Sequence, residues 1–146
     1  GFKILDNRSA SAVALSSTAF INAPIEGGAS ATQSYFGFGL GLANNEAKVG
    51  AYTVAVDSAT LTADGAPASL LVSDDEGENW QTGGAAYQLN DNSRIITAGN
   101  TGSTEPKMFS ELSAPLKISA AVQTSSVLGS DEITLDGNAT LSLVYL

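Results

Sequence analysis

A chain of 146 residues with fifteen acidic and six basic side chains, a net charge of −9, and neither cysteine nor histidine excludes several classes of function. Scattered cations argue against nucleic-acid binding and against a membrane-surface role, and no apolar run approaches the roughly 20 residues of a spanning helix. Disulfides, thiolate nucleophiles, histidine triads and imidazole–zinc sites are ruled out. The length predicts a single domain over residues 1–146.

Most of the chain is predicted to form short strands separated by turns, because apolar residues alternate in short runs and helical periodicity is absent. The strands are expected, in chain order, at residues 1–5, 19–23, 35–42, 49–57, 60–62, 69–73, 80–82, 87–89, 94–98, 116–122 and 139–146. Turn signals recur about every ten residues, a spacing typical of an all-β sandwich or barrel.

The predicted core consists of the large apolar side chains of these strands. They are Phe2, Ile4, Phe20, Ile21, Phe36, Phe38, Tyr52, Val54, Val56, Ile95, Ile96, Ile118, Val122, Leu141 and Leu143. Residues 35–42 alternate large apolar side chains with glycine. This pattern indicates either close approach by another backbone or ring, or a glycine-rich edge strand or turn.

Residues 73–80 have the sequence Ser-Asp-Asp-Glu-Gly-Glu-Asn-Trp, which is similar to the Asp-box with Asn79 in place of its Thr. In that motif the Asp caps backbone amides, the Gly takes a positive φ and the Trp covers the turn. We therefore assign Ser73, Asp75, Gly77 and Trp80 to a structural hairpin. Asp-boxes recur in sialidases, but a sialidase-like site needs an arginine cluster and this chain has two arginines.

The same stretch places four acids within residues 74–78, which raises calcium as an alternative to a solvated turn. Asp75 is the weak calcium candidate, although the distal bidentate Glu of an EF-hand is missing. Trp80, Tyr87 and Tyr35 could stack on a sugar if they are exposed. No residue is assigned as catalytic, no cofactor is expected, and we predict that the protein is not an enzyme.

Residues 136–146 join an Asp-Gly-Asn turn signal to an alternating strand that reaches the last residue. The alternation places Leu141, Leu143 and Tyr145 on one face. Because a terminal strand frays unless it is tied down, we expect this strand to pair in its own sheet or to be offered to a partner.

The C-terminal strand, the turn before it and the cysteine-free all-β pattern resemble subunits of chaperone–usher fimbriae, which carry a penultimate Tyr, here Tyr145. A closer resemblance is to Gram-negative, pilin-like exported proteins of unknown function. The matching stretches are Asp6-Asn7-Arg8, Phe38-Gly39-Leu40-Gly41, Val49-Gly50-Ala51-Tyr52-Thr53, Ser73-Asp74-Asp75 with Gly77 and Trp80, and Asp131-Glu132-Ile133-Thr134-Leu135-Asp136-Gly137.

This resemblance implies an immunoglobulin-like antiparallel β-sandwich, incomplete at its N-terminal side, in a structural subunit of a surface fimbria. The missing strand would come first from a periplasmic chaperone and then from a neighbouring subunit, with Leu141, Leu143 and Tyr145 in the assembly strand. The protein would be exported to the periplasm and then to the cell surface, without membrane insertion.

The chain departs from the fimbrial pattern in two ways. It has no Cys-bearing N-terminal strand or donor extension, and Ile133 stands where such subunits often place Gly. The first departure fits a chain cut before residue 1, whose open sheet edge would self-associate. The main alternative is an adhesin-like, sugar- or receptor-binding surface module that uses Trp80, Tyr87 and the acidic hairpin. A hydrolase would need a pocket with two facing carboxylates.

Overall fold

The computed structural model describes residues 1–13, 37–83 and 86–146, and nearly all of its regular elements are strands. The strands are β1 (Phe2–Asp6), β2 (Phe38–Gly39), β3 (Gly50–Asp57), β4 (Thr62–Ala63), β5 (Ala66–Pro67), β6 (Ser69–Ser73), β7 (Gln81–Thr82), β8 (Ala86–Gln88), β9 (Ile95–Gly99), β10 (Leu112–Ser113), β11 (Leu116–Val122) and β12 (Ala139–Leu143). A 3-10 turn, η1 (Ser9–Ser11), and one short helix, α1 (Ser125–Leu128), complete the set. Within these residues no helix has the length and apolar character needed to cross a membrane.

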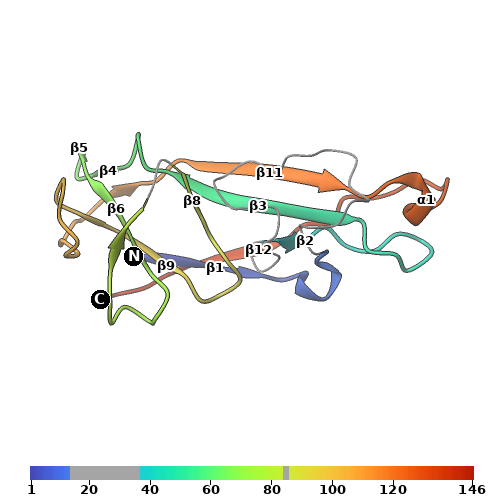
Figure 1. The fold of residues 1–146 in the computed structure, drawn as a ribbon, viewed down its shortest axis with the longest axis horizontal. Helices are drawn as coiled ribbons and strands as arrows, with labels where there is room; N and C mark the ends of the chain where they lie inside the picture. The colour runs from blue at the N-terminus through green and yellow to red at the C-terminus, as the bar shows by residue number, and fades with distance from the viewer. Residues whose placement is uncertain (14–36, 84–85) are drawn as a thin grey trace.

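The strands form two main sheets and one small sheet, and their ladders are antiparallel. The first sheet has the order β12-β1-β9-β6-β7, and the second has the order β11-β3-β2, with β8 also pairing with β3. The small sheet is β10-β4-β5. Figure 1 shows β3 and β11 running above β1, β9 and β12, with both chain ends at the same end of the molecule. The predicted mostly-β antiparallel architecture is therefore confirmed.

A single cluster of buried side chains joins the two main sheets. Phe2, Ile4, Val72 and Ile96 come from the first sheet, and Phe38, Tyr52, Val54 and Val56 come from the second. The rings of Phe38 and Tyr52 stack with centroids 5.3 Å apart. Eight of the predicted core residues are buried: Phe2, Ile4, Phe38, Tyr52, Val54, Val56, Ile95 and Ile96.

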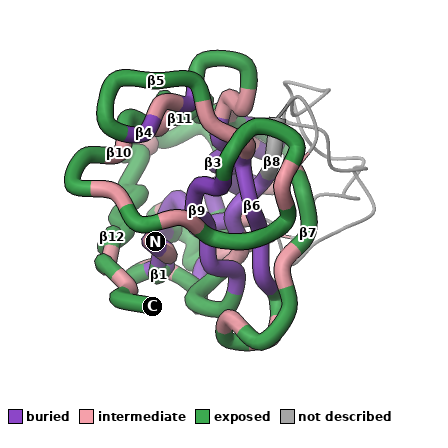
Figure 2. Tube along the Cα trace, turned by 90° about the vertical axis from the view of Figure 1, so that its left-hand side faces the viewer, coloured by how far each residue is buried: buried purple, intermediate pink, exposed green. Residues whose placement is uncertain are grey.

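Three residues predicted to lie in the core are instead exposed. Ile118, Leu141 and Leu143 keep 65%, 49% and 69% of their surface accessible. They lie on β11 and β12, the end strands of the two main sheets, where no described strand covers them. Figure 2 shows the contrast, with β6 and β9 buried and β12 exposed. Phe20, Ile21, Phe36 and the strand expected at 19–23 lie outside the described residues.

Local sterics explain the backbone conformation of two glycine-containing segments. A Cβ built on Gly39 would collide with the carbonyl oxygen of Arg8 and with the Ser11 hydroxyl, so the close approach of another backbone, one of the two interpretations of the glycine pattern, holds at this position. The other, an edge strand, holds as well, because β2 ends its sheet. Asp64 and Gly65, between β4 and β5, have φ values of 52° and 78°, as a type I′ hairpin turn requires. Within its described part, the strand predicted over 35–42 is reduced to β2, because Gly41 has a φ of 87° and leaves the extended region.

Candidate functional site

The outer strand of the first sheet carries apolar side chains that face the core side without being covered. Leu143 lies directly opposite Phe2, and Leu141 lies directly opposite Ile4. Opposite residues of an antiparallel pair project from the same face of the sheet. Because Phe2 and Ile4 are buried in the core, Leu141 and Leu143 also point to the core side, although about half or more of each is exposed.

The outer strand of the second sheet repeats this arrangement. Leu116 pairs with Val56 and Ile118 pairs with Val54, and both valines belong to the buried cluster. Leu116 and Ile118 nevertheless keep 41% and 65% of their surface exposed. Each main sheet therefore ends in a strand whose core-facing side chains lack a covering layer among the described residues.

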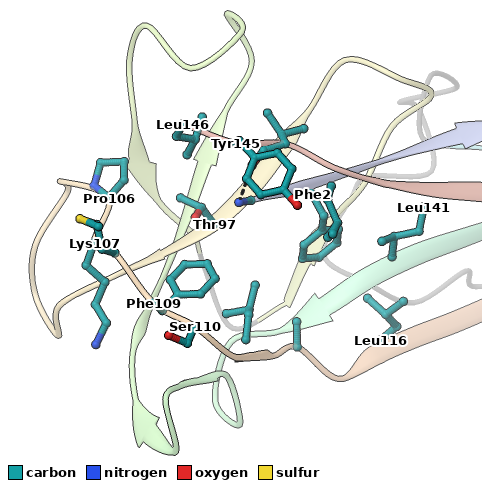
Figure 3. A pocket seen from close by; sticks show the side chains of 16 residues that line it. Phe2, Thr97, Pro106, Lys107, Phe109, Ser110, Leu116, Leu141, Tyr145 and Leu146 are labelled. Atoms are coloured by element: carbon teal, nitrogen blue, oxygen red, sulfur yellow. Dashed lines mark hydrogen bonds between the residues drawn. The ribbon is translucent and has the colours of Figure 1, made fainter.

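A groove of about 810 Å³ lies between these two edges. Figure 3 shows Leu141 and Leu116 projecting from the two facing strands, with Phe2 and Phe109 farther along the groove. Its lining is mostly apolar, and Lys107 supplies the charged side chain. All three residues of the predicted assembly strand, Leu141, Leu143 and Tyr145, line this groove.

The hydrogen bonds of β12 determine which of its backbone groups face outward. Val144 N–H donates to Gly1 O over 2.8 Å, and Asn7 N–H donates to Asn138 O over 2.9 Å. Since alternate residues of an antiparallel ladder bond to the same partner, even-numbered residues from 138 to 144 face β1. The odd-numbered residues direct their N–H and C=O groups away from β1, toward an edge with which no described strand pairs.

The same reasoning applies to β11. Gln123 N–H donates to Val49 O over 2.8 Å, and Asp57 N–H donates to Pro115 O over 3.0 Å. Odd-numbered residues therefore bond to β3, and the even-numbered ones direct their backbone groups outward. On both edges, the residues that present apolar side chains also present the outward-facing backbone groups.

One wall of the groove, residues 106–112, is held in place by Asp64. Its carboxylate accepts hydrogen bonds from the N–H groups of Ser110 and Glu111 over 2.8 and 2.9 Å. Its own N–H donates to Glu111 O over 2.8 Å. The bonds from Glu111 and Ser110 lower the pKa of Asp64. Leu112 then continues the wall as part of β10, paired with β4.

The turn that follows β1 contacts the segment that leads into β12 through hydrogen bonds and an ion pair. Asn7 Nδ2 donates to Asn138 Oδ1 over 2.6 Å and to Thr140 Oγ1 over 2.8 Å. Arg8 forms an ion pair with Asp136 at 3.0 Å, and the hydrogen bond in this pair raises the pKa of Arg8. The two segments 6–8 and 136–140 are therefore in direct contact, although they are more than 125 residues apart.

The Asp-box-like residues form a turn between β6 and β7. Ser73 Oγ donates to Asp75 Oδ1 over 2.7 Å and accepts from Gly77 N–H over 2.9 Å. Asp75 also accepts from the side chain and the backbone of Asn79 over 2.6 and 2.8 Å, and these bonds, with that from Ser73, lower its pKa to about 2. Gly77 has a φ of 93°, and a Cβ there would lie 3.5 Å from Trp80 Cζ2, so the indole lies beside the turn.

Calcium binding and sugar binding are the alternatives to a purely structural role for this hairpin. Both carboxylate oxygens of Asp75 already accept protein hydrogen bonds, and Asp74 forms a bidentate pair with Arg94 at 2.7 and 2.9 Å. Over the described ranges, no cluster of three or more His, Cys, Asp or Glu side chains could hold a metal ion. Tyr35 and the side chain of Tyr87 lie outside what the structure describes, so a sugar platform with Trp80 stays a prediction.

Sequence reasoning did not assign Leu116 or Phe109 to a site. Alternation in β11 does place Leu116 and Ile118 on one face, but it does not reveal that this strand ends its sheet. The contribution of residues 106–112 depends on the contact with Asp64, about 46 positions earlier, which no local pattern encodes.

Two proteins of Escherichia coli (strain K12) are similar to this chain. Protein GltF is 29% identical over 163 aligned positions, which cover 97% of this chain and 61% of GltF. The uncharacterized protein YhcF is 32% identical over 130 positions, which cover 84% of this chain and 54% of YhcF. The chain is a distant homologue of both. It thus spans between 54% and 61% of the length of these relatives from a Gram-negative bacterium. No family model and no solved structure matches it.

Proposed function

We propose that this protein is a structural subunit of a surface fimbria, or a fimbria-like protein, that assembles by β-strand complementation. The observation that carries the proposal is the row of exposed, core-facing side chains on the two edge strands: Leu116, Leu141 and Leu143 line the groove, and Ile118 follows Leu116 along β11. A partner strand laid between β11 and β12 would cover them and would bond to the outward backbone groups.

In this proposal the two main sheets form an immunoglobulin-like sandwich that lacks one strand. Their common core and the uncovered side chains at one side support this interpretation. The exposed surface of the four side chains equals roughly two whole residues, so covering it would contribute about 3 to 6 kcal/mol before the cost of ordering the partner. Backbone hydrogen bonds to the outward-facing groups of β11 and β12 would add to this contribution.

The proposed route is export to the periplasm, complementation by a chaperone, and exchange for a strand of a neighbouring subunit at the cell surface. The role is non-enzymatic. Distant homology to two proteins of a Gram-negative bacterium is compatible with this route. The groove would serve as the acceptor, and Tyr145, which is 91% exposed, would extend the contact beyond β12.

The test is made in the native host. Surface material is sheared, left unheated in SDS and blotted with an antibody to this domain. Strand-complemented polymers dissociate slowly, so we expect a ladder that collapses to one band on boiling. A single unheated band confined to the periplasm would refute the polymer, and binding on a glycan array would then favour the adhesin-like alternative.

A matched pair of variants on β11 links the ladder to the groove. Leu116→Asp places a charge among the apolar groove side chains, whereas Lys117→Asp places one on the opposite face of the same strand. We expect Leu116→Asp to abolish the ladder and Lys117→Asp to retain it. Equal ladders from both variants would show that the groove is not the acceptor.

A further inference from the structure

The outer edge of β12 lacks the features that usually prevent edge strands from associating. Residues 139–146 contain no charged side chain and no proline. Natural edge strands are commonly protected by Lys, Pro or a bulge. On the other side of the groove, β11 carries Lys117 and directly follows Pro115. Of the two edges, β12 is therefore the one open to pairing.

This edge is self-complementary about Ser142. Its outward backbone groups belong to Leu141 and Leu143, one on each side of Ser142. If two copies are related by a twofold axis at Ser142, Leu141 of one copy lies opposite Leu143 of the other, and the two exchange both hydrogen bonds. The same register brings the exposed leucines of the two copies together on the core-facing side.

Charge also favours contact through this strand. Each copy carries a net charge of −9, so most surfaces of two copies repel each other. Residues 139–146 carry no charged side chain. Two acidic copies therefore approach through this uncharged, apolar edge at a lower electrostatic cost than through a face that carries carboxylates.

We infer that two copies of this chain pair antiparallel through their β12 edges, with the twofold axis at Ser142, and join their first sheets into one continuous sheet. The inference does not depend on the proposed function, although it uses the same edge. A donor strand that bonds to β12 would compete with the second copy, so the pair would protect the edge until a donor arrives.

Because the chain contains no cysteine, a single introduced thiol reports the register. In the inferred pair Ser142 lies directly opposite Ser142 of the second copy, with a Cα separation of about 4.5 Å, which a disulfide can bridge. We expect Ser142→Cys to form a covalent dimer, seen on a non-reducing gel, when dissolved oxygen oxidises the two thiols. Reduction should restore the monomer.

Two further variants control for random collision. Thr140 would lie opposite Val144 of the second copy, so Thr140→Cys alone and Val144→Cys alone should cross-link poorly. An equimolar mixture of the two should yield the mixed dimer. If Ser142→Cys forms no more covalent dimer than either single control, or if the mixture forms none, the register is refuted. Each variant is first checked for native circular dichroism and cooperative unfolding.

Sedimentation gives a readout without cross-linking. The wild-type protein should shift toward twice the monomer mass as its concentration rises, and more so in about 0.5 M salt, which screens the repulsion between acidic copies. Ser142→Asp sets like charges opposite each other and should remain monomeric, while its side chain stays beside Lys3 and off the groove face. Wild-type protein that stays monomeric at all salt concentrations would overturn the inference.

The two proposals fail separately. Ser142→Asp should lose the dimer and keep the native ladder, whereas Leu116→Asp should lose the ladder and keep the dimer. A Ser142→Asp variant that keeps the dimer, or a Leu116→Asp variant that loses it with the fold intact, would refute the inferred pairing through the β12 edge.

Discussion

Phe2 and Leu143 face each other across one ladder, and truncating them should have very different costs. Phe2 is 5% exposed in the core, so Phe2→Ala should lower the free energy of unfolding by about 3 to 5 kcal/mol. Leu143 buries only about a third of its surface, and full burial of a leucine contributes about 1.5 to 3 kcal/mol. Leu143→Ala should therefore cost no more than about 1 kcal/mol.

Urea unfolding followed by Trp80 fluorescence, at a protein concentration low enough to avoid association, measures both values. The slope with denaturant should stay constant, so that a shift in midpoint reports stability. If Leu143→Ala costs as much as Phe2→Ala, Leu143 is covered in solution and the open groove is wrong. If the cost of Leu143→Ala increases with protein concentration, the extra stability comes from a second copy.

Three other changes test the supporting structure. Gly39→Ala should destabilise by about 1 to 3 kcal/mol in urea, because the Arg8 carbonyl occupies the space of the new methyl group. Asp74→Ala leaves the largely buried Arg94 without its carboxylate partner and should cost about 1.5 to 3 kcal/mol by the same assay. The pKa of Asp75 is lowered to about 2 in the folded protein. The stability that its ionised carboxylate contributes is therefore present above about pH 4 and is lost as the pH falls toward 2. The melting temperature of Asp75→Asn should therefore lie below that of the wild type at neutral pH and approach it in acid. A difference in melting temperature that stays constant with pH would contradict this prediction.

The sequence predicted best the longer strands, whose apolar and β-branched residues favour an extended backbone. Residues 69–73 and 116–122 were predicted with the observed bounds, and residues 49–57 differ by one position. The short strands β5 and β10 were missed, because they exist only through the Asp64 turn and its bonds to residues 110–111. Helix α1 was missed too, since four residues are too few for a helical period.

The candidate site was predicted only in part. Leu141, Leu143 and Tyr145 were assigned to an assembly strand, and they line the groove. Placing Leu141, Leu143 and Ile118 in the core was wrong, because alternation identifies which face a side chain takes and not whether another layer covers that face. The neighbours of β11 and β12 are a property of topology, which a single sequence does not encode locally.

The position of β1 has a consequence for the order of folding. Its two neighbours are distant in sequence, with Phe2 paired to Ile96 on one side and to Leu143 on the other. Closing such long loops costs entropy that grows with the logarithm of their length, and chains built on distant pairings fold slowly. During synthesis, Phe2 leaves the ribosome long before either partner exists. Completion of the first sheet is therefore a late event, and until then the nascent chain is most prone to aggregation.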